Sequence, residues 1–520
     1  MPKHNATDAT RPALIDHRSP WHASALAESL HTRPLDADIS ADVCVVGAGM
    51  AGLLCALELA ERGRSVVVVD RAHVGAGDTS ATTAHLSAIL DHRYFELASM
   101  HGEDAAKLIA SSHMRGIAHL ERVVNAYDID CGFRRVDGFL CAGNADQEKD
   151  LAREYSAATD AGLKCELVRR APLAAADGPA LRVAQQAQFE PLEFLAGVVK
   201  ALKQRGVQLF APVTVNEFDE SSSAEVTLTT TQGKRIRAGH VVVATHSPVN
   251  DVAAMHTKQA AYRTYAIAFE ATDTPPTLAW DMDDPYHYVR VGVDADTDRP
   301  VLIVGGEDHR VGQDGDAEKN FPRLETWARE HFPSVGQIAC QWSGQVFEPS
   351  DGIAFIGKNP GQERVLILTG FSGNGMTYSA LSAELIADLI GGVSHPFAEL
   401  YDPKRKPKSA SAISSFIQEN LNTAAQYSDW LAPADVASAD EIARGEGAVI
   451  RRGVRRVAVY VDEAGSRHEL SATCPHLGGV VAWNSAEKSW DCPCHGSRFD
   501  CHGKVLTGPA VSDLKPVPAG

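Results

Sequence analysis

The sequence predicts an α/β protein in which a dinucleotide-binding domain encloses a β-rich region and is followed by a small all-β domain at the C-terminus. Three observations predict this fold class. A short apolar strand, a glycine-rich turn, a helix and a second strand follow one another over residues 42–70. Further short strands follow over residues 207–245, and the end of the chain combines short strands with a cluster of cysteines and histidines. A chain of 520 residues is long enough for two or three such domains.

Composition narrows the class of protein. Hydrophobic residues make up 44% and charged residues 22%, as in ordinary globular proteins. The net charge of −18 disfavours nucleic acid and anionic membranes as partners. The N-terminal segment lacks a signal-peptide core, and the sequence predicts no transmembrane span, so we expect a cytoplasmic location.

The chain divides into parts with different patterns. An irregular lead-in precedes the dinucleotide-binding domain, whose β-rich substrate region is rich in aromatic residues, and a linker with a helix leads to the last domain. The expected limits are 1–40 for the lead-in, 41–393 for the dinucleotide-binding domain with its substrate region at about 256–345 and in parts of 95–200, 394–440 for the linker and 441–520 for the all-β domain.

The first strand and helix enclose a dinucleotide-binding motif. Gly47, Gly49 and Gly52 have the G-x-G-x-x-G spacing, which lets the backbone approach a pyrophosphate at the N-terminus of a helix. Asp70 ends the second strand, where a carboxylate can hydrogen-bond a ribose. The alternative is a glycine-rich turn that serves only the packing of helix on sheet.

Five segments together resemble one group of FAD enzymes. They are GAGMAG (47–52), GAGDTSATTAHLS (75–87), HVVVAT (240–245), PSDGIAFIG (349–357) and TGFSGNGM (369–376). Over about 42–393 the chain resembles the D-amino-acid oxidase and glycine oxidase group. One departure is His246, where a glycine is commoner in such flavoproteins.

The resemblance implies a set of FAD contacts. The threonines would lie along the pyrophosphate and flavin, Val213 would meet the adenine, and residues 373–376 would approach the pyrimidine end of the flavin. The implied contacts are Gly47, Gly49, Met50, Ala51, Gly52, Asp70, Arg71, Thr79, Thr82, Thr83, Val213, Ala244, Gly373, Asn374, Gly375 and Met376.

The C-terminal cluster has metal-ligand spacing. Cys474 and His476 form a C-x-H motif, and Cys492 and His495 form a C-x-x-H motif. Two cysteines and two histidines suit either a Rieske-type 2Fe-2S cluster or a structural zinc ion. The segments CPHLGG, WDCPCHGSRFD and GPA are similar to Rieske proteins over about 445–517, which favours the iron-sulfur cluster.

Four positions bear on the cluster's chemistry. High-potential Rieske proteins carry a cysteine in place of Gly479, bridged to the cysteine equivalent to Cys494, so that bridge is absent here. The resemblance places Ser497 as a hydrogen-bond donor toward a cluster sulfur, whereas Phe499 replaces a tyrosine hydroxyl. Fewer donors stabilise the reduced cluster less, so we expect a potential below that of respiratory-complex Rieske proteins.

The substrate contacts are predicted by analogy with the amine-oxidising enzymes. Tyr262, Tyr265, Tyr288 and Arg290 are candidates, because tyrosine hydroxyls and a guanidinium suit a carboxylate. The alternative is that the residues of YHYVR merely alternate along a strand. A mononuclear iron site at His113 and His119 is less expected than two histidines on a helix surface.

The resemblance implies an FAD-dependent oxidoreductase. The expected reaction is oxidation of an amino acid or secondary amine by hydride transfer to the flavin, with electrons passing singly through a Rieske cluster to an external acceptor such as a soluble carrier. Two alternatives remain. One is an electron-transfer or redox-sensing module without an organic substrate of its own, and the other is an oxidase that uses oxygen directly.

Overall fold

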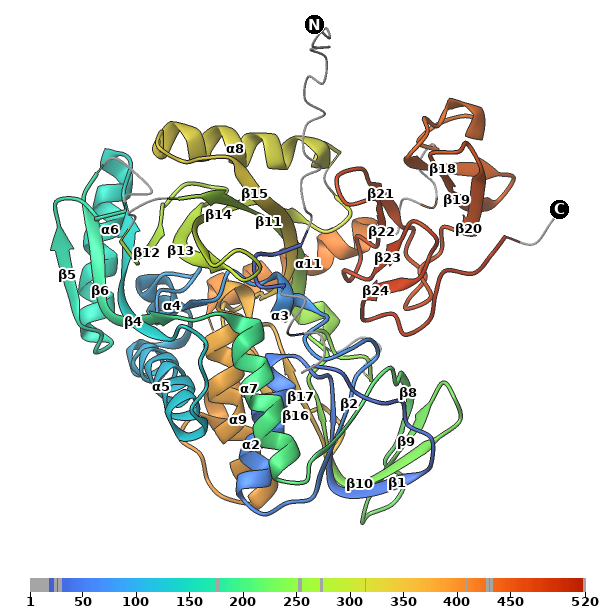
Figure 1. The fold of residues 1–520 in the computed structure, drawn as a ribbon, viewed down its shortest axis with the longest axis horizontal. Coiled ribbons are helices and arrows are strands. Elements are labelled where there is room, and N and C mark those ends of the chain that lie inside the picture. The colour runs from blue at the N-terminus through green and yellow to red at the C-terminus, as the bar shows by residue number, and fades with distance from the viewer. Residues whose placement is uncertain are drawn as a thin grey trace, which may run out of the picture.

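The structure, a computed structural model, has two large mixed sheets in one body and two small sheets at the C-terminal end (Figure 1). The first 17 residues of the expected lead-in lie outside the described part. Trp21, which follows them, is buried, and its indole N–H donates to the carbonyl of Thr82 at 2.7 Å. The described residues are 18–22, 26, 30–173, 178–250, 255–271, 275–313, 315–407, 409–426, 430 and 434–517.

The first sheet carries the dinucleotide motif. Its strands are β1 (Ile39–Val46), β2 (Val66–Val69), β7 (Gln208–Phe210), β8 (Val215–Asp219), β9 (Val226–Thr230), β10 (Arg235–Val243), β16 (Phe355–Lys358) and β17 (Val365–Thr369). The path runs β16–β17–β10–β1–β2–β7, and β9 and β8 extend from β10. From β17 to β7 the neighbours are parallel, as the βαβ pattern predicts.

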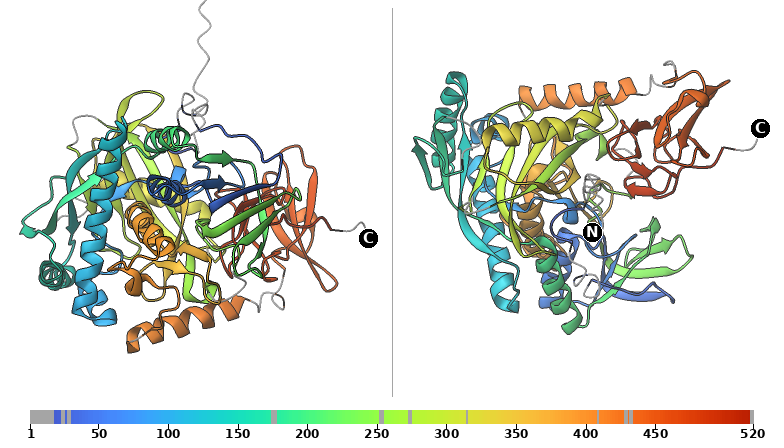
Figure 2. Two further views of the ribbon diagram at one scale, coloured as in Figure 1. Left: turned by 90° about the horizontal axis from the view of Figure 1, so that it is seen from below. Right: turned by 45° about the horizontal axis from the view of Figure 1, so that its top comes forward.

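Helices cover the sheets. They are α2 (Met50–Glu61), α3 (Asp78–Ala81), α4 (Tyr94–His101), α5 (Glu103–Tyr127), α6 (Ala145–Asp160), α7 (Pro191–Gln204), α8 (Asn320–His331), α9 (Gly375–Gly391), α10 (Ala398–Tyr401) and α11 (Ala410–Gln426). α2 packs between α7 and α9, and α5 packs on α9. The left view of Figure 2 shows the blue α2 beside the orange α9. None of the helices in the described residues is long and apolar enough to cross a membrane.

The second sheet is the β-rich region. Its strands are β3 (His85–Leu86), β4 (Arg134–Cys141), β5 (Cys165–Val168), β6 (Ala180–Gln188), β11 (Gln259–Glu270), β12 (Leu278–Trp280), β13 (Tyr288–Asp294), β14 (Arg299–Arg310) and β15 (Ile338–Pro349). The path runs β15–β11–β14–β13–β12–β4–β6–β3, with β5 on β6. The aromatic-rich segment therefore supplies five strands of this sheet, and residues 85–188 supply the others.

The C-terminal unit consists of a three-stranded and a four-stranded sheet. Its strands are β18 (Glu446–Arg452), β19 (Arg455–Val461), β20 (Arg467–Ser471), β21 (Ala482–Asn484), β22 (Ser489–Asp491), β23 (Arg498–Asp500) and β24 (Val505–Thr507). The short 3-10 helices are η1 (His256–Lys258), η2 (Ala317–Lys319), η3 (Ser372–Asn374) and η5 (Ala439–Glu441). The right view of Figure 2 shows the orange α11 leading to this red unit. The all-β class predicted for this end of the chain is confirmed.

Candidate functional site

A cavity opens at the carboxyl ends of β1, β2 and β10, the sheet edge where doubly wound proteins bind ligands. From there it continues to β11, β13, β14 and β15 of the second sheet. All the predicted FAD contacts except Gly52 line it. They are Gly47, Gly49, Met50, Ala51, Asp70, Arg71, Thr79, Thr82, Thr83, Val213, Ala244, Gly373, Asn374, Gly375 and Met376.

Close backbone contacts explain two of the glycines. Gly47 has a φ of +112°, and a Cβ there would lie 2.3 Å from the carbonyl oxygen of Ala244. A Cβ at Gly52 would lie 1.9 Å from the carbonyl oxygen of Gly47, so Gly52 serves the packing of α2 on the turn. At the start of α2 the N–H of Met50 donates to the hydroxyl of Thr79 at 3.0 Å. The open turn and helix N-terminus fit a pyrophosphate.

Asp70 lies where a ribose would bind. Its two carboxylate oxygens accept the N–H groups of Ala48 at 2.7 Å and Ala72 at 2.8 Å. Burial raises the pKa of Asp70, although these bonds oppose the shift. Each carboxylate oxygen can accept a second hydrogen bond, so a sugar hydroxyl can still be held. Val213, whose N–H donates to the Asp70 carbonyl at 2.7 Å, provides an apolar wall beside it.

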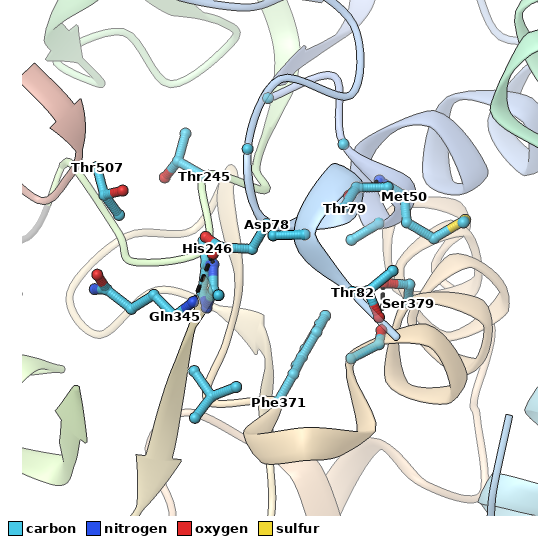
Figure 3. A pocket seen from close by; sticks show the side chains of 18 of the residues that line it. Met50, Asp78, Thr79, Thr82, Thr245, His246, Gln345, Phe371, Ser379 and Thr507 are labelled. Carbon is cyan, nitrogen blue, oxygen red and sulfur yellow. Dashed lines mark hydrogen bonds and ion pairs between the residues drawn. The ribbon is translucent and has the colours of Figure 1, made fainter. Parts of the chain in front are cut away.

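A hydrogen bond to Asp78 holds the ring of His246. Its φ of +68° is the left-handed conformation in which glycine is commoner. The Nδ1 atom lies 2.8 Å from a carboxylate oxygen of Asp78, whose other oxygen accepts the N–H of Gln345 at 2.7 Å. Burial opposes ionisation of Asp78, but His246 and Arg263 outweigh it and hold the pKa at about 2. Figure 3 shows this group at the cavity wall.

The other end of the cavity carries acidic and aromatic side chains. Asp91, Asp308, Tyr286 and Tyr288 line it. The Tyr288 hydroxyl lies 2.9 Å from the hydroxyl of Thr264, and the Tyr286 hydroxyl lies 3.5 Å from a carboxylate oxygen of Asp91. Asp91 also accepts the N–H of Gly373, in the predicted flavin loop, at 2.8 Å. Of the predicted substrate contacts, Tyr288 therefore reaches the cavity. Asp91 and Asp308 lie in no motif that would have predicted their place in the cavity.

Arg290 lies outside the cavity lining, in contrast to its prediction as a substrate contact. Its fully buried guanidinium donates to the carbonyls of Thr83, Ala84 and Phe189 at 2.9 to 3.1 Å. It also pairs with Glu190 at 3.2 Å. Its donors are thus used within the protein, and Arg290 joins the 83–84 segment to the second sheet.

Tyr262 and Tyr265 also lie outside the cavity lining. The guanidinium of Arg310 lies 5.3 Å from the Tyr262 ring and pairs with Glu419. Tyr265 is completely buried and packs edge-on against Phe321 at 4.9 Å. Both tyrosines pack between secondary-structure elements.

The two predicted cluster-binding loops lie side by side. The thiols of Cys474 and Cys492 lie beside each other, and the imidazole centroids of His476 and His495 lie 5.1 Å apart. The thiols and the imidazoles therefore form two separate pairs. A Rieske cluster takes the two cysteines on one iron and the two histidines on the other, so this arrangement fits it.

The zinc alternative fits the geometry less well. Tetrahedral zinc needs four ligand atoms around one point. Within the described part of the chain, one group of three or more His, Cys, Asp and Glu has ligand atoms within 4.8 Å of one another, namely Asp281, Asp283 and His287. The two cysteines and two histidines of the cluster loops do not converge in this way.

The positions at which high-potential Rieske proteins carry a disulfide bridge lie next to each other in the structure. A Cβ at Gly479 would lie 2.5 Å from the sulfur of Cys494, which is buried. The missing bridge would therefore join these two positions. The hydroxyl of Ser497 lies beside the Cys474 thiol and accepts the N–H of Ala510 at 3.0 Å.

His256 joins the two cofactor domains. It lies in η1, and its ring centroid is 4.7 Å from that of His476 and 5.5 Å from that of His495. On its other side its Nδ1 atom lies 3.4 Å from the hydroxyl of Ser247, and residues 245–246 line the cavity. One imidazole thus separates the cluster ligands from the segment that borders the FAD cavity.

A buried ionic network holds the domains together. Arg263 of β11 donates to Glu487 of the C-terminal unit at 2.9 Å. Arg498 pairs with the same carboxylate at 3.0 Å and with Asp491 at 2.9 Å. Burial opposes ionisation of Glu487, but the two guanidiniums outweigh it and hold its pKa well below the usual range. The interface is therefore a specific, charge-matched contact.

The C-terminal unit also forms part of the cavity wall. Residues 506–508 line the cavity, and Arg71 donates to the carbonyl of Leu506 at 2.5 Å. The amide of Gln345 donates to the carbonyl of Gly496 at 2.9 Å. Figure 3 shows Thr507 on the same side of the cavity as Gln345.

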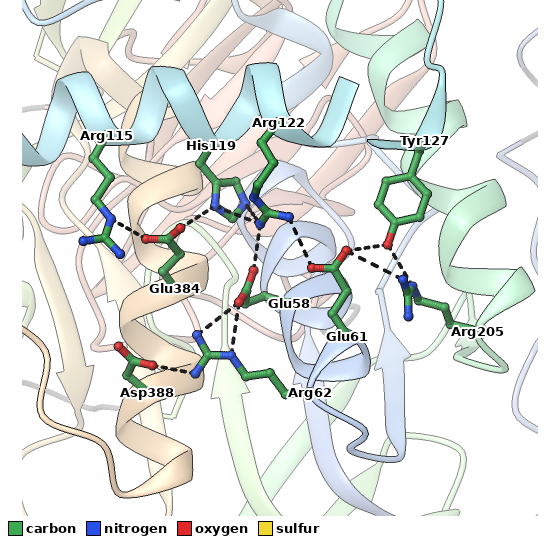
Figure 4. A network of polar contacts seen from close by, with 10 residues as sticks. All are labelled: Glu58, Glu61, Arg62, Arg115, His119, Arg122, Tyr127, Arg205, Glu384 and Asp388. Carbon is green, nitrogen blue, oxygen red and sulfur yellow. Dashed lines mark hydrogen bonds and ion pairs between the residues drawn. The ribbon is translucent and has the colours of Figure 1, made fainter. Parts of the chain in front are cut away.

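The helix histidines of α5 are buried, so the prediction that they lie on a helix surface is wrong. His113 is fully buried, and its Nδ1 atom lies 3.0 Å from the carbonyl of Ile109. His119 lies 3.2 Å from Glu384, which also pairs with Arg115 (Figure 4). The hydrogen bond from His119 holds the pKa of Glu384 at about 2. His119 belongs to a structural network between α2, α5 and α9, and His113 packs edge-on against Tyr378 of α9.

Comparison with known proteins matches both parts of the chain. The family model described as FAD dependent oxidoreductase matches residues 42–389, and the Rieske [2Fe-2S] domain model matches residues 432–518. The Rieske 2Fe-2S iron-sulfur protein YhfW of Bacillus subtilis is 28% identical over 93% of this chain and 94% of its own. The γ-glutamylputrescine oxidoreductase of Escherichia coli is 23% identical over 74% of this chain and 91% of its own.

Among solved structures, glycine oxidase from Geobacillus kaustophilus matches with a TM-score of 0.60 and 19% identity. The match covers 71% of this chain and 99% of that one. L-proline dehydrogenase from P. horikoshii matches with a TM-score of 0.57 and 19% identity, over 72% of this chain and 98% of that one. At this identity, the likeness establishes the fold.

Proposed function

We propose, since the chain belongs to the FAD dependent oxidoreductase family, that it oxidises an amino acid or a secondary amine and passes the electrons to an external acceptor such as a soluble carrier. Its cofactors are FAD and one Rieske-type 2Fe-2S cluster. When bound, FAD accepts a hydride and the cluster carries one electron at a time, so together they convert a two-electron oxidation into single-electron steps.

The docked C-terminal domain is the observation that carries this proposal. His476 and His495 face His256 of the FAD-binding part, and residues 506–508 border the cavity itself. The ionic network from Arg263 to Asp491 holds this arrangement. A domain fixed in this position supports electron passage within one chain.

The residues proposed to hold the cofactors follow from the geometry. The open turn at Gly47, the N-terminus of α2 and the Asp70 carboxylate would hold the pyrophosphate and ribose. The cluster would be bound by Cys474, Cys492, His476 and His495. The relatives support the substrate class, since the E. coli protein is named for γ-glutamylputrescine and one solved structure for glycine.

The test is anaerobic mixing of the holoenzyme with a panel of amino acids and alkylated amines while the visible spectrum is recorded. We expect one compound to bleach the flavin bands, followed by loss of the cluster bands. Reduction of both centres by dithionite but by no organic compound would instead support an electron-transfer module. Rapid peroxide formation in air, with the cluster still oxidised, would support a direct oxidase.

The contact at His256 has its own test. A His256→Leu variant should bleach the flavin at the normal rate but reduce the cluster more slowly, because the imidazole between the domains is removed. His331→Ala, at an exposed position of α8, is the matched control. An unchanged rate of cluster reduction in His256→Leu would show that electrons reach the cluster by another route.

A further inference from the structure

The acidic end of the cavity is distinct in chemistry from the predicted FAD contacts. Asp91 and Asp308 line it together with the rings of Tyr286 and Tyr288. Asp91 comes from the loop before α4 and Asp308 from β14, so the fold brings together residues more than two hundred positions apart. None of these four residues belongs to the dinucleotide-binding motifs.

A bulge in β14 aims Asp308 into the cavity. Between the pairs Arg263–His309 and Tyr265–Gly306, β14 contains one residue more than β11. Glu307, next to Asp308, has a φ of +56°. Bulges of this kind redirect side chains and are frequent beside active sites.

Asp308 has an unmet hydrogen-bonding requirement. Its Oδ1 atom is buried without a hydrogen-bond partner. Burial raises the pKa of Asp308 to about 7, and the neighbouring Asp91 adds to the shift, whereas Thr264 and His287 oppose it. Burial and the same two aspartates raise the pKa of Glu348, on β15, to about 8. A cation placed here would relieve the repulsion and satisfy the buried oxygen.

The rings complete a site suited to an ammonium group. The Tyr286 and Tyr288 centroids lie 5.9 Å apart, and the Tyr288 ring covers Gly305, where a Cβ would lie 2.1 Å from it. Faces of aromatic rings attract ammonium groups, and carboxylates pair with them. Trp280 adds a third aromatic wall.

The basic side chains that line the cavity, which could bind a carboxylate, have other partners or are neutral. Among the described lining residues, Arg71 is the one arginine or lysine, and it lies beside Asp70 and donates to Leu506. Burial and Arg290 lower the pKa of His85 to about 3, which leaves it neutral. His246 is paired with Asp78. His287, which acts on Asp308, pairs with Asp281 and Glu307 outside the cavity lining. None of the described lining residues at the acidic end therefore offers a cation to an α-carboxylate.

We propose that Asp91, Asp308, Tyr286 and Tyr288 form a binding site for a protonated aliphatic amine, so that the substrate is an amine with a second cationic nitrogen and not an α-amino acid. This inference rests on the proposed function and names its substrate class. The neighbouring carboxylates favour the cation, and they repel the α-carboxylate of an amino acid.

The test compares molecules that differ by one carboxylate. Anaerobic oxidised holoenzyme is titrated with cadaverine and lysine, and with putrescine and ornithine, and binding is followed by the shift of the flavin spectrum and by calorimetry. We expect each diamine to bind at least about tenfold more tightly than its amino acid. In Asp308→Asn this preference should fall by at least about tenfold, and Asp308→Glu should retain part of it.

Asp104→Asn is the matched control, since that side chain is 98% exposed on α5, and it should behave as wild type. Equal or tighter binding of the amino acids by wild-type protein would overturn the inference, even if Asp308→Asn fails to fold. Unchanged preference in Asp308→Asn would overturn it too. If amino acids reduce the flavin, the proposed function stands without this substrate class. If neither class binds or reduces it, both fail.

Discussion

Two regions of the molecule bury charge in opposite ways. At the domain interface each buried charge has a partner of opposite sign, as Glu487 has in Arg263 and Arg498. At the acidic end of the cavity, Asp308 keeps a buried oxygen without a hydrogen-bond partner next to Asp91. Buried charges that are paired with each other hold the structure together, whereas a buried carboxylate without a partner can be stabilised by a cationic ligand. Variants in the two regions should therefore have different signatures.

The largest effect is expected at the interface. Glu487→Gln leaves Arg263 and Arg498 without their shared carboxylate, which should lower the free energy of unfolding by about 3–5 kcal/mol. Urea unfolding of the holoprotein measures this loss. Glu463→Gln, at an exposed position of the same domain, is the control. A loss below about 1 kcal/mol would show that the interface charges are not essential.

A substitution of Arg290, which the sequence predicted as a substrate contact, tests whether its buried charge has a structural role instead. Arg290→Lys keeps the charge but cannot bond three carbonyls and Glu190 together, so the free energy of unfolding should fall by about 1.5–3 kcal/mol. Amine affinity in the variant that remains folded should be unchanged. A loss of amine affinity without a loss of stability would show that Arg290 contacts the substrate after all.

Removing the carboxylate of Asp308 should have the opposite effect and stabilise the folded protein at high pH. Its folded pKa, about 7, lies above the unfolded value, so the stability it contributes is present at low pH and is lost as the pH rises through 7. Asp91 and Glu307 favour the protonated form, and Thr264 and His287 oppose it. Relative to wild type, Asp308→Asn should be about 2–3 kcal/mol more stable at pH 8 than at pH 5. Urea unfolding at both pH values decides; a variant that is less stable at pH 8 would mean that Asp308 is a paired charge.

The smallest effect is expected at a neutral group near the interface. Ser497→Ala leaves the buried N–H of Ala510 without its acceptor, so it should lower the free energy of unfolding by about 1 kcal/mol. It removes a hydrogen bond near Cys474, and a net ~1 kcal/mol bond corresponds to about 40 mV for one electron. The potential should fall by about this amount in a redox titration followed by electron paramagnetic resonance. An unchanged potential would show that Ser497 does not bond the reduced cluster.

Features local in sequence were predictable. The turn at Gly47 and the pairs Cys474–His476 and Cys492–His495 lie within short segments, so residue type and spacing alone indicate the chemistry. The parallel sheet followed from alternating strands and helices. These features need few long-range contacts to take their form.

The substrate end was not predictable in the same way. Arg290 and Tyr288 lie two apart on β13, but the arginine is covered by the 83–84 segment, which no periodicity reveals. Asp308 faces the cavity because of a bulge. His256 gains its place only when the domains dock. Each of these outcomes depends on packing between distant segments.

The loop at residues 506–508 has a consequence for assembly of the protein. Because it belongs to one domain and borders the cofactor cavity of the other, a chain that lacks the C-terminal domain has a flavin pocket open on that side. FAD should therefore dissociate faster from a chain that lacks the C-terminal domain than from the full-length protein.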